Sequence, residues 1–145
     1  MRGLLQRVRR AAVVAGGAEV GAIQQGVLLL VGIAPADTVA SADTLLDRVL
    51  RYRLFPDAQG RMNLSLADIG GGLLIVSQFT LMADTRKGLR PSFTPAAPPE
   101  LAERLYNHFV ARAQERHAPV ACGVFGADMQ VALVNDGPVT LLLEV

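Results

Sequence analysis

Residues 135–140 read Asn-Asp-Gly-Pro-Val-Thr and separate two apolar runs, 129–134 and 139–145. Glycine tolerates backbone angles that other residues avoid, and proline fixes its own φ and lacks a backbone donor. Gly137 and Pro138 therefore predict a rigid corner whose carbonyl groups have fixed directions. Two interpretations stay open here: a hairpin turn that joins two strands, or a rigid part of a functional site.

The composition predicts a single domain, residues 1–145, with an aliphatic core. The chain is 51% hydrophobic but has only five Phe, two Tyr and no Trp, so Leu, Val, Ile and Ala must fill that core. Its apolar runs are too short for a membrane-spanning helix of about 20 residues, and early arginines break any signal-peptide pattern. The single cysteine, Cys122, excludes a disulfide framework. We expect a soluble cytoplasmic protein.

The net charge of +1 argues against a strongly cationic nucleic-acid coat. Four arginines precede the first acidic residue, Glu19, and we interpret them as a solvated face. Arg86, Lys87 and Arg90 lie in a loop containing Gly and Pro, directly after a polar strand end. Their place in the chain makes these three cations candidates for contacts with phosphate groups.

The first third of the chain has strand patterns. Residues 3–8 and 11–14 predict strand segments broken at the two arginines between them, and a Gly-Gly turn leads to a strand at 19–23. Residues 26–33 form one continuous apolar run, as expected of a strand buried on both faces.

Two helices follow, with a strand between them. Pro35 and Asp37 open the first helix, which ends before Pro56. Residues 62–68 are ambiguous, and a triple glycine precedes a strand at 73–81.

After a long loop at 83–99, Glu100 starts a second helix with Leu101, Leu105, Phe109 and Ala113 on one face. Residues 120–125, 129–134 and 139–145 complete the chain as strands. This order predicts an α+β fold with a mixed or mainly antiparallel sheet and two main helices.

The sequence lacks the motifs of common hydrolases. It has no Gly-x-Ser-x-Gly, no phosphate-binding Gly-rich Lys loop, no His-Glu-x-x-His and no cysteine pair. His108 and His117 lie on or just after the second helix, where a boundary position is expected instead of a catalytic one. We expect neither a metal nor a cofactor.

Ser77, Gln78 and Thr80 end the strand predicted at 73–81, with Gln78 and Thr80 on the same face. They could simply satisfy backbone groups. A Thr80 nucleophile would need an adjacent base, and only Asp84 is near in sequence. Alternatively, backbone N–H groups at the strand end could hold an oxyanion, with the substrate supplying a helpful hydroxyl.

Five motifs follow one another along the chain: Ser77-Gln78-Phe79-Thr80-Leu81, Ala83-Asp84-Thr85-Arg86-Lys87-Gly88, Arg90-Pro91-Ser92-Phe93, Phe125-Gly126-Ala127-Asp128-Met129-Gln130-Val131 and the corner Asn135-Asp136-Gly137-Pro138-Val139-Thr140. In their order and spacing, these motifs resemble the D-aminoacyl-tRNA deacylases. Gln6-Arg7-Val8 and Gly70-Gly71-Gly72-Leu73-Leu74 fit as well, so the resemblance covers the whole chain.

The resemblance implies a barrel-like α+β fold and hydrolysis of the ester between a D-amino acid and the terminal ribose of tRNA. It also implies acceptance of glycyl-tRNA and a homodimer with active sites at the subunit interface. In that family the motif matched by Gly137-Pro138 has a cis peptide bond, reaches into the partner's site and excludes the side chain of an L-amino acid.

The resemblance also implies roles for particular residues. Ser77, Gln78, Phe79 and Thr80 would form the catalytic wall, Arg7, Asn135 and Thr140 would support the corner, and Phe125 and Met129 would line the adenine pocket. The ribose 2′-hydroxyl would assist the attack, without a side-chain nucleophile.

Three alternatives remain. One is a covalent hydrolase that uses Thr80 and forms an acyl-enzyme. Another is a relative with a trans Gly-Pro bond that removes small L-amino acids. The third is an RNA-binding module without catalysis, which the few aromatics and the near-neutral charge disfavour.

Overall fold

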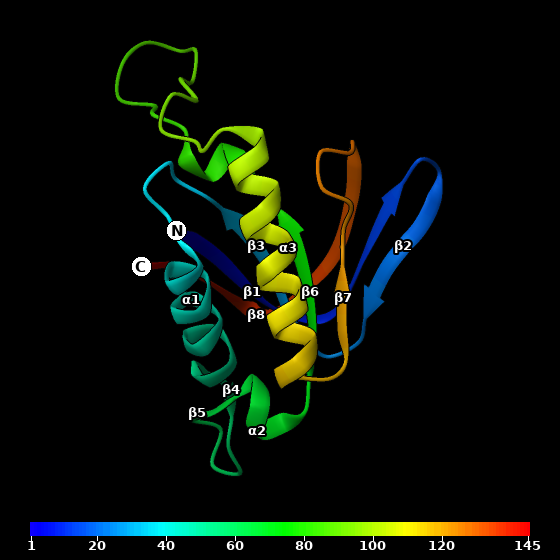
Figure 1. Cartoon of the computed structure of the whole chain (residues 1–145). Helices are drawn as coiled ribbons and strands as arrows, with labels where there is room; N and C mark the ends of the chain where they lie inside the picture. The colour runs from blue at the N-terminus through cyan, green and yellow to red at the C-terminus, as the bar shows by residue number, and fades with distance from the viewer.

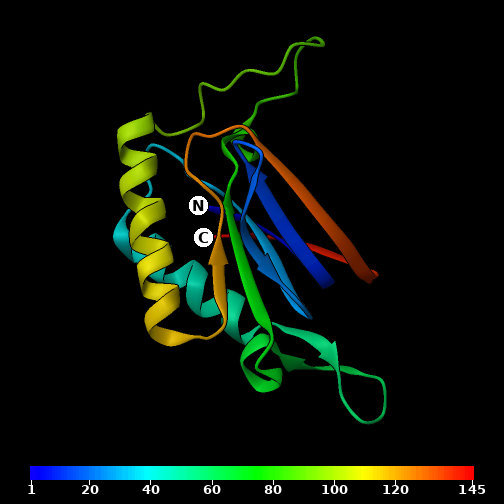
Figure 2. The ribbon, with the colours of Figure 1, turned by 90° about the vertical axis from the view of Figure 1, so that its right-hand side faces the viewer.

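Strand β1 (Arg2–Ala15) is the common element of the sheet in the computed structural model, which describes residues 1–145. Its first half pairs antiparallel with β3 (Gly26–Gly32), and its second half with β2 (Ala18–Ile23). The long strand β8 (Met129–Glu144) pairs antiparallel with both halves. Because β1 changes partner midway, the sheet curls, as Figure 2 shows from the side.

The rest of the sheet is parallel. β6 (Gly72–Ser77) pairs with β3, and β7 (Val120–Cys122) pairs with β6. Parallel neighbours need crossover connections, which contain α1 (Val39–Arg51) and α3 (Pro99–Arg116). Both helices cover the same face of the sheet (Figure 1). The smaller elements are the β4–β5 pair (Arg53–Pro56 and Met62–Ser65), α2 (Leu66–Ile69) and the 3₁₀ helix η1 (Phe79–Met82).

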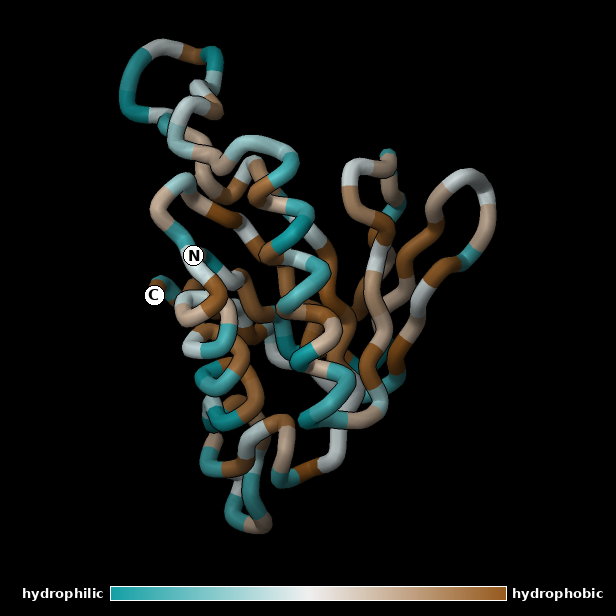
Figure 3. The backbone as a smooth tube through the Cα atoms, in the orientation of Figure 1, coloured by the Kyte–Doolittle hydropathy of each residue, from teal (hydrophilic) through white to brown (hydrophobic).

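Strand β3 is buried on both faces, as its apolar run predicts. Val27, Leu29 and Val31 belong to the larger core, which lies between the sheet and the two long helices. Leu28 belongs to a second core inside the curled sheet. Figure 3 shows largely apolar strands of the sheet behind α3, whose outward residues are mostly hydrophilic.

The curled sheet nearly closes where β2 approaches β7. A Cβ atom on Gly21 would lie 2.8 Å from the carbonyl oxygen of Cys122, so a side chain there would push the two strands apart. The predicted α+β fold, with a mixed, barrel-like sheet and two main helices, is confirmed.

The helices follow the sequence with one shift. Leu105, Phe109 and Ala113 of α3 are buried as predicted, and Leu101 is half-buried. The first helix begins at Val39 and not at Pro35–Asp37, because Thr38 and Ser41 cap each other's backbone N–H groups. None of the helices has both the length and the apolar character that crossing a membrane requires.

Two predicted interruptions are wrong. β1 is one strand through Arg9 and Arg10, which are exposed, and the ladder with β8 absorbs the irregularity as register shifts. β8 is also one strand, so residues 135–140 are not a hairpin turn. The apolar runs on the two sides of the corner both form hydrogen-bonded pairs with β1. The corner is therefore a bulge between them.

Two predicted strands are too long. β6 ends at Ser77 instead of residue 81, because its neighbour β3 ends at Gly32 and the chain turns into η1. The expected alternation of faces through Thr80 therefore does not occur. β7 ends at Cys122, opposite Ile75, and does not reach Phe125. The ambiguous residues 62–68 form β5 and begin α2.

Candidate active site

A cavity of about 500 Å³ opens where β6 ends, beside the start of α3. Five residues predicted for catalysis or adenosine binding line it: Ser77, Gln78, Phe79, Phe125 and Met129. One wall is the end of β6 with the start of η1, and the other is the segment that leads into β8. Eleven of the sixteen lining residues are hydrophobic, so the cavity suits an apolar ring with polar atoms at its edge.

The backbone changes direction at the first wall. The N–H of Gln78 donates to the carbonyl of Val31 at 2.7 Å, and the N–H of Leu81 then donates to the carbonyl of Gln78 at 3.2 Å. The amides of Phe79 and Thr80 lie ahead of this first 3₁₀ bond, where helix amides lack an intrahelical acceptor. These two amides are therefore donors without a partner in η1.

Thr80 does not line the cavity, and its hydroxyl accepts a hydrogen bond from the Gln78 carboxamide. Asp84, the carboxylate nearest to Thr80 in sequence, is occupied by Arg86, whose Nε and Nη2 donate to it at 2.9 and 2.7 Å. These hydrogen bonds hold the pKa of Asp84 well below its usual range. Asp84 is therefore a poor base for Thr80, which weakens the covalent alternative.

The loop after η1 stands away from the rest of the molecule (Figures 1 and 2). Its base is an isolated β-bridge in which Asp84 and Ser92 exchange hydrogen bonds of 2.8 and 3.0 Å. Phe93 of the loop packs edge-on against Phe79 of the cavity wall, with ring centroids 5.0 Å apart. The three predicted phosphate contacts, Arg86, Lys87 and Arg90, are all exposed on this loop.

The Gly-Pro corner bulges from the middle of β8. Asn135 pairs with Val8 and Thr140 with Gln6, so the intervening residues lie opposite Arg7. The Gly137–Pro138 peptide bond is cis, and Gly137 has a φ of +144°, in the region that favours glycine. Gly137 and Pro138 are exposed.

Arg7, Asn135 and Thr140 all contact the corner. Arg7 Nε donates to the carbonyl of Asp136 at 2.8 Å, while its Nη1 donates to the carbonyl of Leu54 at 2.6 Å. Asn135 Nδ2 donates to Thr140 Oγ1 at 2.9 Å, and Asn135 Oδ1 accepts from the N–H of Val139 at 2.7 Å. The hydrogen bonds of these side chains hold the bulge in place where the pairing between β1 and β8 is interrupted.

One chain does not bring the corner to its own cavity, because no residue of 135–140 lines it. Arg7 pairs with Val27, whereas the cavity residue Val31 pairs with Gly3, four residues along β1. Four residues of strand span roughly 13 Å at about 3.3 Å per residue. β1 and β3 also separate the corner on β8 from the wall on β6.

The histidines lie elsewhere, at the boundary positions expected. His108 Nε2 lies 3.0 Å from an oxygen of Asp43, and His117 Nε2 lies 2.6 Å from the carbonyl oxygen of Gly71. Neither lines the cavity. The structure contains no group of three or more His, Cys, Asp or Glu side chains that could hold a metal.

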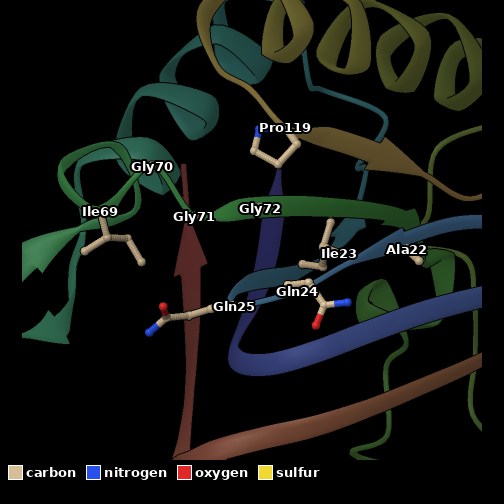
Figure 4. A pocket seen from close by; sticks show the side chains of 9 residues that line it. All are labelled: Ala22, Ile23, Gln24, Gln25, Ile69, Gly70, Gly71, Gly72 and Pro119. Carbon is tan, nitrogen blue, oxygen red and sulfur yellow. The ribbon is translucent and has the colours of Figure 1, made fainter.

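A second cavity, of about 440 Å³, lies at the other end of β6 (Figure 4). It is bounded by Gln24 and Gln25 after β2 and by the glycines at 70–72, a set that no sequence pattern marked as a site. None of its lining residues is ionisable. Figure 4 shows the two carboxamides pointing in different directions, so they do not converge on a common point.

Sequence reasoning missed Tyr106, a buried residue of α3 whose ring centroid lies 5.8 Å from that of Phe125. The helical spacing predicted an apolar face of Leu101, Leu105, Phe109 and Ala113 and did not include Tyr106. The available signal was the rarity of tyrosine, which occurs twice in the chain.

Comparison with known proteins finds relatives along the whole chain. The family model described as D-Tyr-tRNA(Tyr) deacylase matches residues 4–144. A protein named D-aminoacyl-tRNA deacylase from Pseudomonas fluorescens is 64% identical over 144 residues, which are 99% of each chain.

Two solved structures are similar in shape. One is titled c-Myc DNA Unwinding Element Binding Protein and is 40% identical, with a TM-score of 0.95 over 100% of this chain and 99% of its own. The other is titled Structural Analysis of a probable eukaryotic D-amino acid tRNA deacylase. It has a TM-score of 0.85 at 16% identity, over 99% of this chain and 98% of its own, and supports the fold alone.

Proposed function

The chain belongs to the D-Tyr-tRNA(Tyr) deacylase family, and we propose that it hydrolyses the ester joining a D-amino acid to the terminal ribose of tRNA. The products are free tRNA and the D-amino acid, so the reaction is a proofreading step in translation. The observation that carries this proposal is the cavity at the end of β6, which gathers Ser77, Gln78, Phe79, Phe125 and Met129. Since aminoacyl-tRNA is used in translation, we infer a cytoplasmic location.

The terminal adenosine enters between the two walls of the cavity. Phe125 and Met129 contact the adenine ring, and Ser77 and Gln78 face the ribose and the ester. The largely apolar lining supports this orientation, because it can bury a flat base while leaving the ester at the polar edge.

Catalysis requires no side-chain nucleophile and no cofactor. Water attacks the ester carbonyl carbon, the carbonyl oxygen becomes an oxyanion, and the ribose oxygen leaves with a proton. The amides of Phe79 and Thr80 stabilise the oxyanion, and one such donor typically contributes about 100- to 1,000-fold in rate. The ribose 2′-hydroxyl assists the attacking water.

The active enzyme is a homodimer in which the corner of one chain completes the cavity of its partner. The distance between the corner and the cavity within one chain supports this arrangement, as does the exposure of Gly137 and Pro138. Val134 and Leu142 of β8 are 41% and 52% exposed, so the strand that carries the corner also offers apolar contact area.

The Gly137-Pro138 corner is the chirality filter. Its carbonyl groups occupy the space that the side chain of an L-amino acid would need, whereas a D side chain points away. Glycine has no side chain to exclude, so glycyl-tRNA is also a substrate.

The exposed loop contacts the tRNA backbone. Lys87 and Arg90 have no ion-pair partner within the chain, which favours them as phosphate contacts. Arg86 is proposed for the same role, although its guanidinium is already paired with Asp84.

The test is the deacylation of matched D-tyrosyl-tRNA and L-tyrosyl-tRNA by the purified protein. We expect rapid loss of the D ester with the L ester spared, and hydrolysis of glycyl-tRNA. Loss of both tyrosyl esters would contradict the role of the corner. Loss of neither would contradict hydrolysis itself.

Nucleic-acid binding without hydrolysis is the second candidate. The exposed Phe79–Phe93 pair beside Lys87 and Arg90 favours it, because stacking aromatics and cations bind single strands. A relative titled as a DNA-binding protein agrees with it. It leaves the supported corner without a role, and intact D-tyrosyl-tRNA in the presence of tight binding would favour it.

A further inference from the structure

Tyr106 buries a polar atom between α3 and the sheet. The residue is 2% exposed, and its hydroxyl donates to the carbonyl of Ile75 at 2.9 Å, with the carbonyl of Gly123 at 3.4 Å. Burial raises the pKa of the Tyr106 hydroxyl well above its ordinary value, so the group remains a donor. The other buried positions of α3, Leu105, Phe109 and Ala113, are apolar.

The two carbonyls belong to the two walls of the cavity. Ile75 is two residues before Ser77 on β6, and Gly123 is two residues before Phe125. The N–H of Gly123 also donates to the carbonyl of Ile75, at 2.9 Å. Tyr106 is therefore the third member of a junction that joins both walls.

The junction lies where the walls separate. The last ladder pair between β6 and β7 is Ile75 with Cys122, and beyond it the chain segments diverge around the cavity. The Tyr106 ring also packs at a tilt of 41° against Phe125, which lines the cavity. The Tyr106 side chain thus contacts the backbone of both walls where they begin to separate, and it also packs against the ring of Phe125 in one wall.

We propose that Tyr106 is a positioning residue, whose hydroxyl and ring set the gap between the two walls and thereby the affinity for the terminal adenosine. The inference rests on the proposed function. A phenylalanine would fill the same core volume, so the hydroxyl is explained by its two carbonyl partners and not by packing.

The first test is Tyr106→Phe, compared with wild type on D-tyrosyl-tRNA. Loss of one buried hydrogen bond corresponds to a change of about 3- to 10-fold in binding. We expect KM to rise by that factor while kcat changes less than about 2-fold, because the lost contact acts on the ground state and the transition state alike.

Direct binding separates affinity from chemistry. The probe is D-tyrosine joined through an amide to 3′-amino-3′-deoxyadenosine, which retains the base and resists hydrolysis. Its Kd, measured by calorimetry, is expected to rise by the same factor as KM in Tyr106→Phe.

Val49→Ala is the matched control. Val49 is buried in the core on α1 and does not line the cavity, so this variant loses thermal stability while KM and the probe Kd are expected to stay unchanged. If Tyr106→Phe lowers the melting temperature but leaves KM and Kd within about 1.5-fold of wild type, the hydroxyl is only structural and the proposal is overturned.

Gly123→Ala tests the junction if Tyr106→Phe does not fold. The added Cβ would lie 2.7 Å from Met129 Sδ, so it must displace a flexible side chain of the cavity wall. We expect a weaker probe Kd, and an unchanged Kd would overturn the proposal that wall spacing sets affinity. If the wild-type protein hydrolyses D-tyrosyl-tRNA but KM and the probe Kd are unchanged in these variants, only this inference is contradicted. If the wild-type protein neither hydrolyses D-tyrosyl-tRNA nor binds the probe, the proposed function is contradicted as well.

Discussion

The cavity at the end of β6 and the corner in β8 differ in what holds them in place. The cavity is shaped by the backbone, through the turn into η1 and the junction at Ile75, and by packing of apolar side chains. The corner is an exposed bulge that depends on a few hydrogen bonds from Arg7 and Asn135. Single substitutions at the corner should therefore have larger effects than substitutions of polar side chains near the cavity. Selectivity between D and L esters should accordingly be more sensitive to substitution than hydrolysis itself.

The largest effect is expected from Gly137→Ala. A Cβ at Gly137 would lie 2.8 Å from Val139 Cγ2 and 3.1 Å from Arg7 Nη2, at a φ of +144° that L residues rarely adopt. We expect the ratio of kcat/KM for D-tyrosyl-tRNA over L-tyrosyl-tRNA to fall roughly 100-fold, the scale of a displacement of about 1 Å at a reacting centre.

Gly60→Ala is the control for that variant. Gly60 also has a positive φ, +77°, but nothing lies within 4 Å of its added Cβ, and it belongs to the turn between β4 and β5. It should lose stability and keep the ratio. A Gly137→Ala enzyme with the wild-type ratio would contradict the filter.

Arg7→Lys should have the next largest effect. The guanidinium reaches the carbonyls of Asp136 and Leu54 at once, and a lysine ammonium cannot reproduce that fork. A hydrogen bond from a charged group contributes about 1.5 kcal/mol at the low end, so we expect the same selectivity ratio to fall about 10-fold. Arg9→Lys, which alters only an exposed ion pair with Asp136, should change it less than about 2-fold. Equal effects of the two variants would argue against a bracing role for Arg7.

Lys87→Ala addresses the loop, which belongs to neither region. We expect KM for D-tyrosyl-tRNA to rise about 2- to 5-fold and the slope of log affinity against log salt to become shallower by about 0.7 to 0.9. Arg86→Ala sharpens the result, because its guanidinium pairs with Asp84. If Arg86 only stabilises the loop, its loss leaves the salt slope unchanged, and if it contacts phosphate the slope becomes shallower as well.

Thr80→Ala is expected to have the smallest effect. The Thr80 hydroxyl accepts from Gln78, and Asp84 is held by Arg86, so neither arrangement prepares a nucleophile. The backbone amide of residue 80 remains in the variant, and kcat should fall less than about 2-fold, without a trapped acyl-enzyme in wild type. A fall of 100-fold or more, or a trapped intermediate, would restore the covalent mechanism.

Local patterns predicted much of the fold. Leu105, Phe109 and Ala113 of α3 were predicted to face the core, and β3 was recognised as doubly buried because an apolar run without alternation has no solvent side. The C-terminal end of β6 and the continuity of β8 were not predicted. A strand continues only as far as a partner offers hydrogen bonds, and the partner is distant in sequence.

The candidate site divides in the same way. The resemblance implied a catalytic wall of Ser77, Gln78, Phe79 and Thr80 and an adenine pocket with Phe125 and Met129. The structure places five of these six residues around one cavity and leaves Thr80 outside its lining. Tyr106 was missed, because a tyrosine on an apolar helix face has the pattern of a core residue until its hydroxyl has a partner.

The amino-acid pattern alone determined the fold class, the core of β3 and α3, the family and the residue types available for chemistry, because these depend on hydrophobic spacing and local motifs. Only the tertiary structure decided that residues 135–140 are a bulge and not a turn, and that the corner and the cavity lie apart in one chain. Both facts follow from β1, whose two halves pair with both halves of β8 and thereby hold the corner away from β6. Pairing across more than a hundred residues is a global property, and no local pattern encodes it.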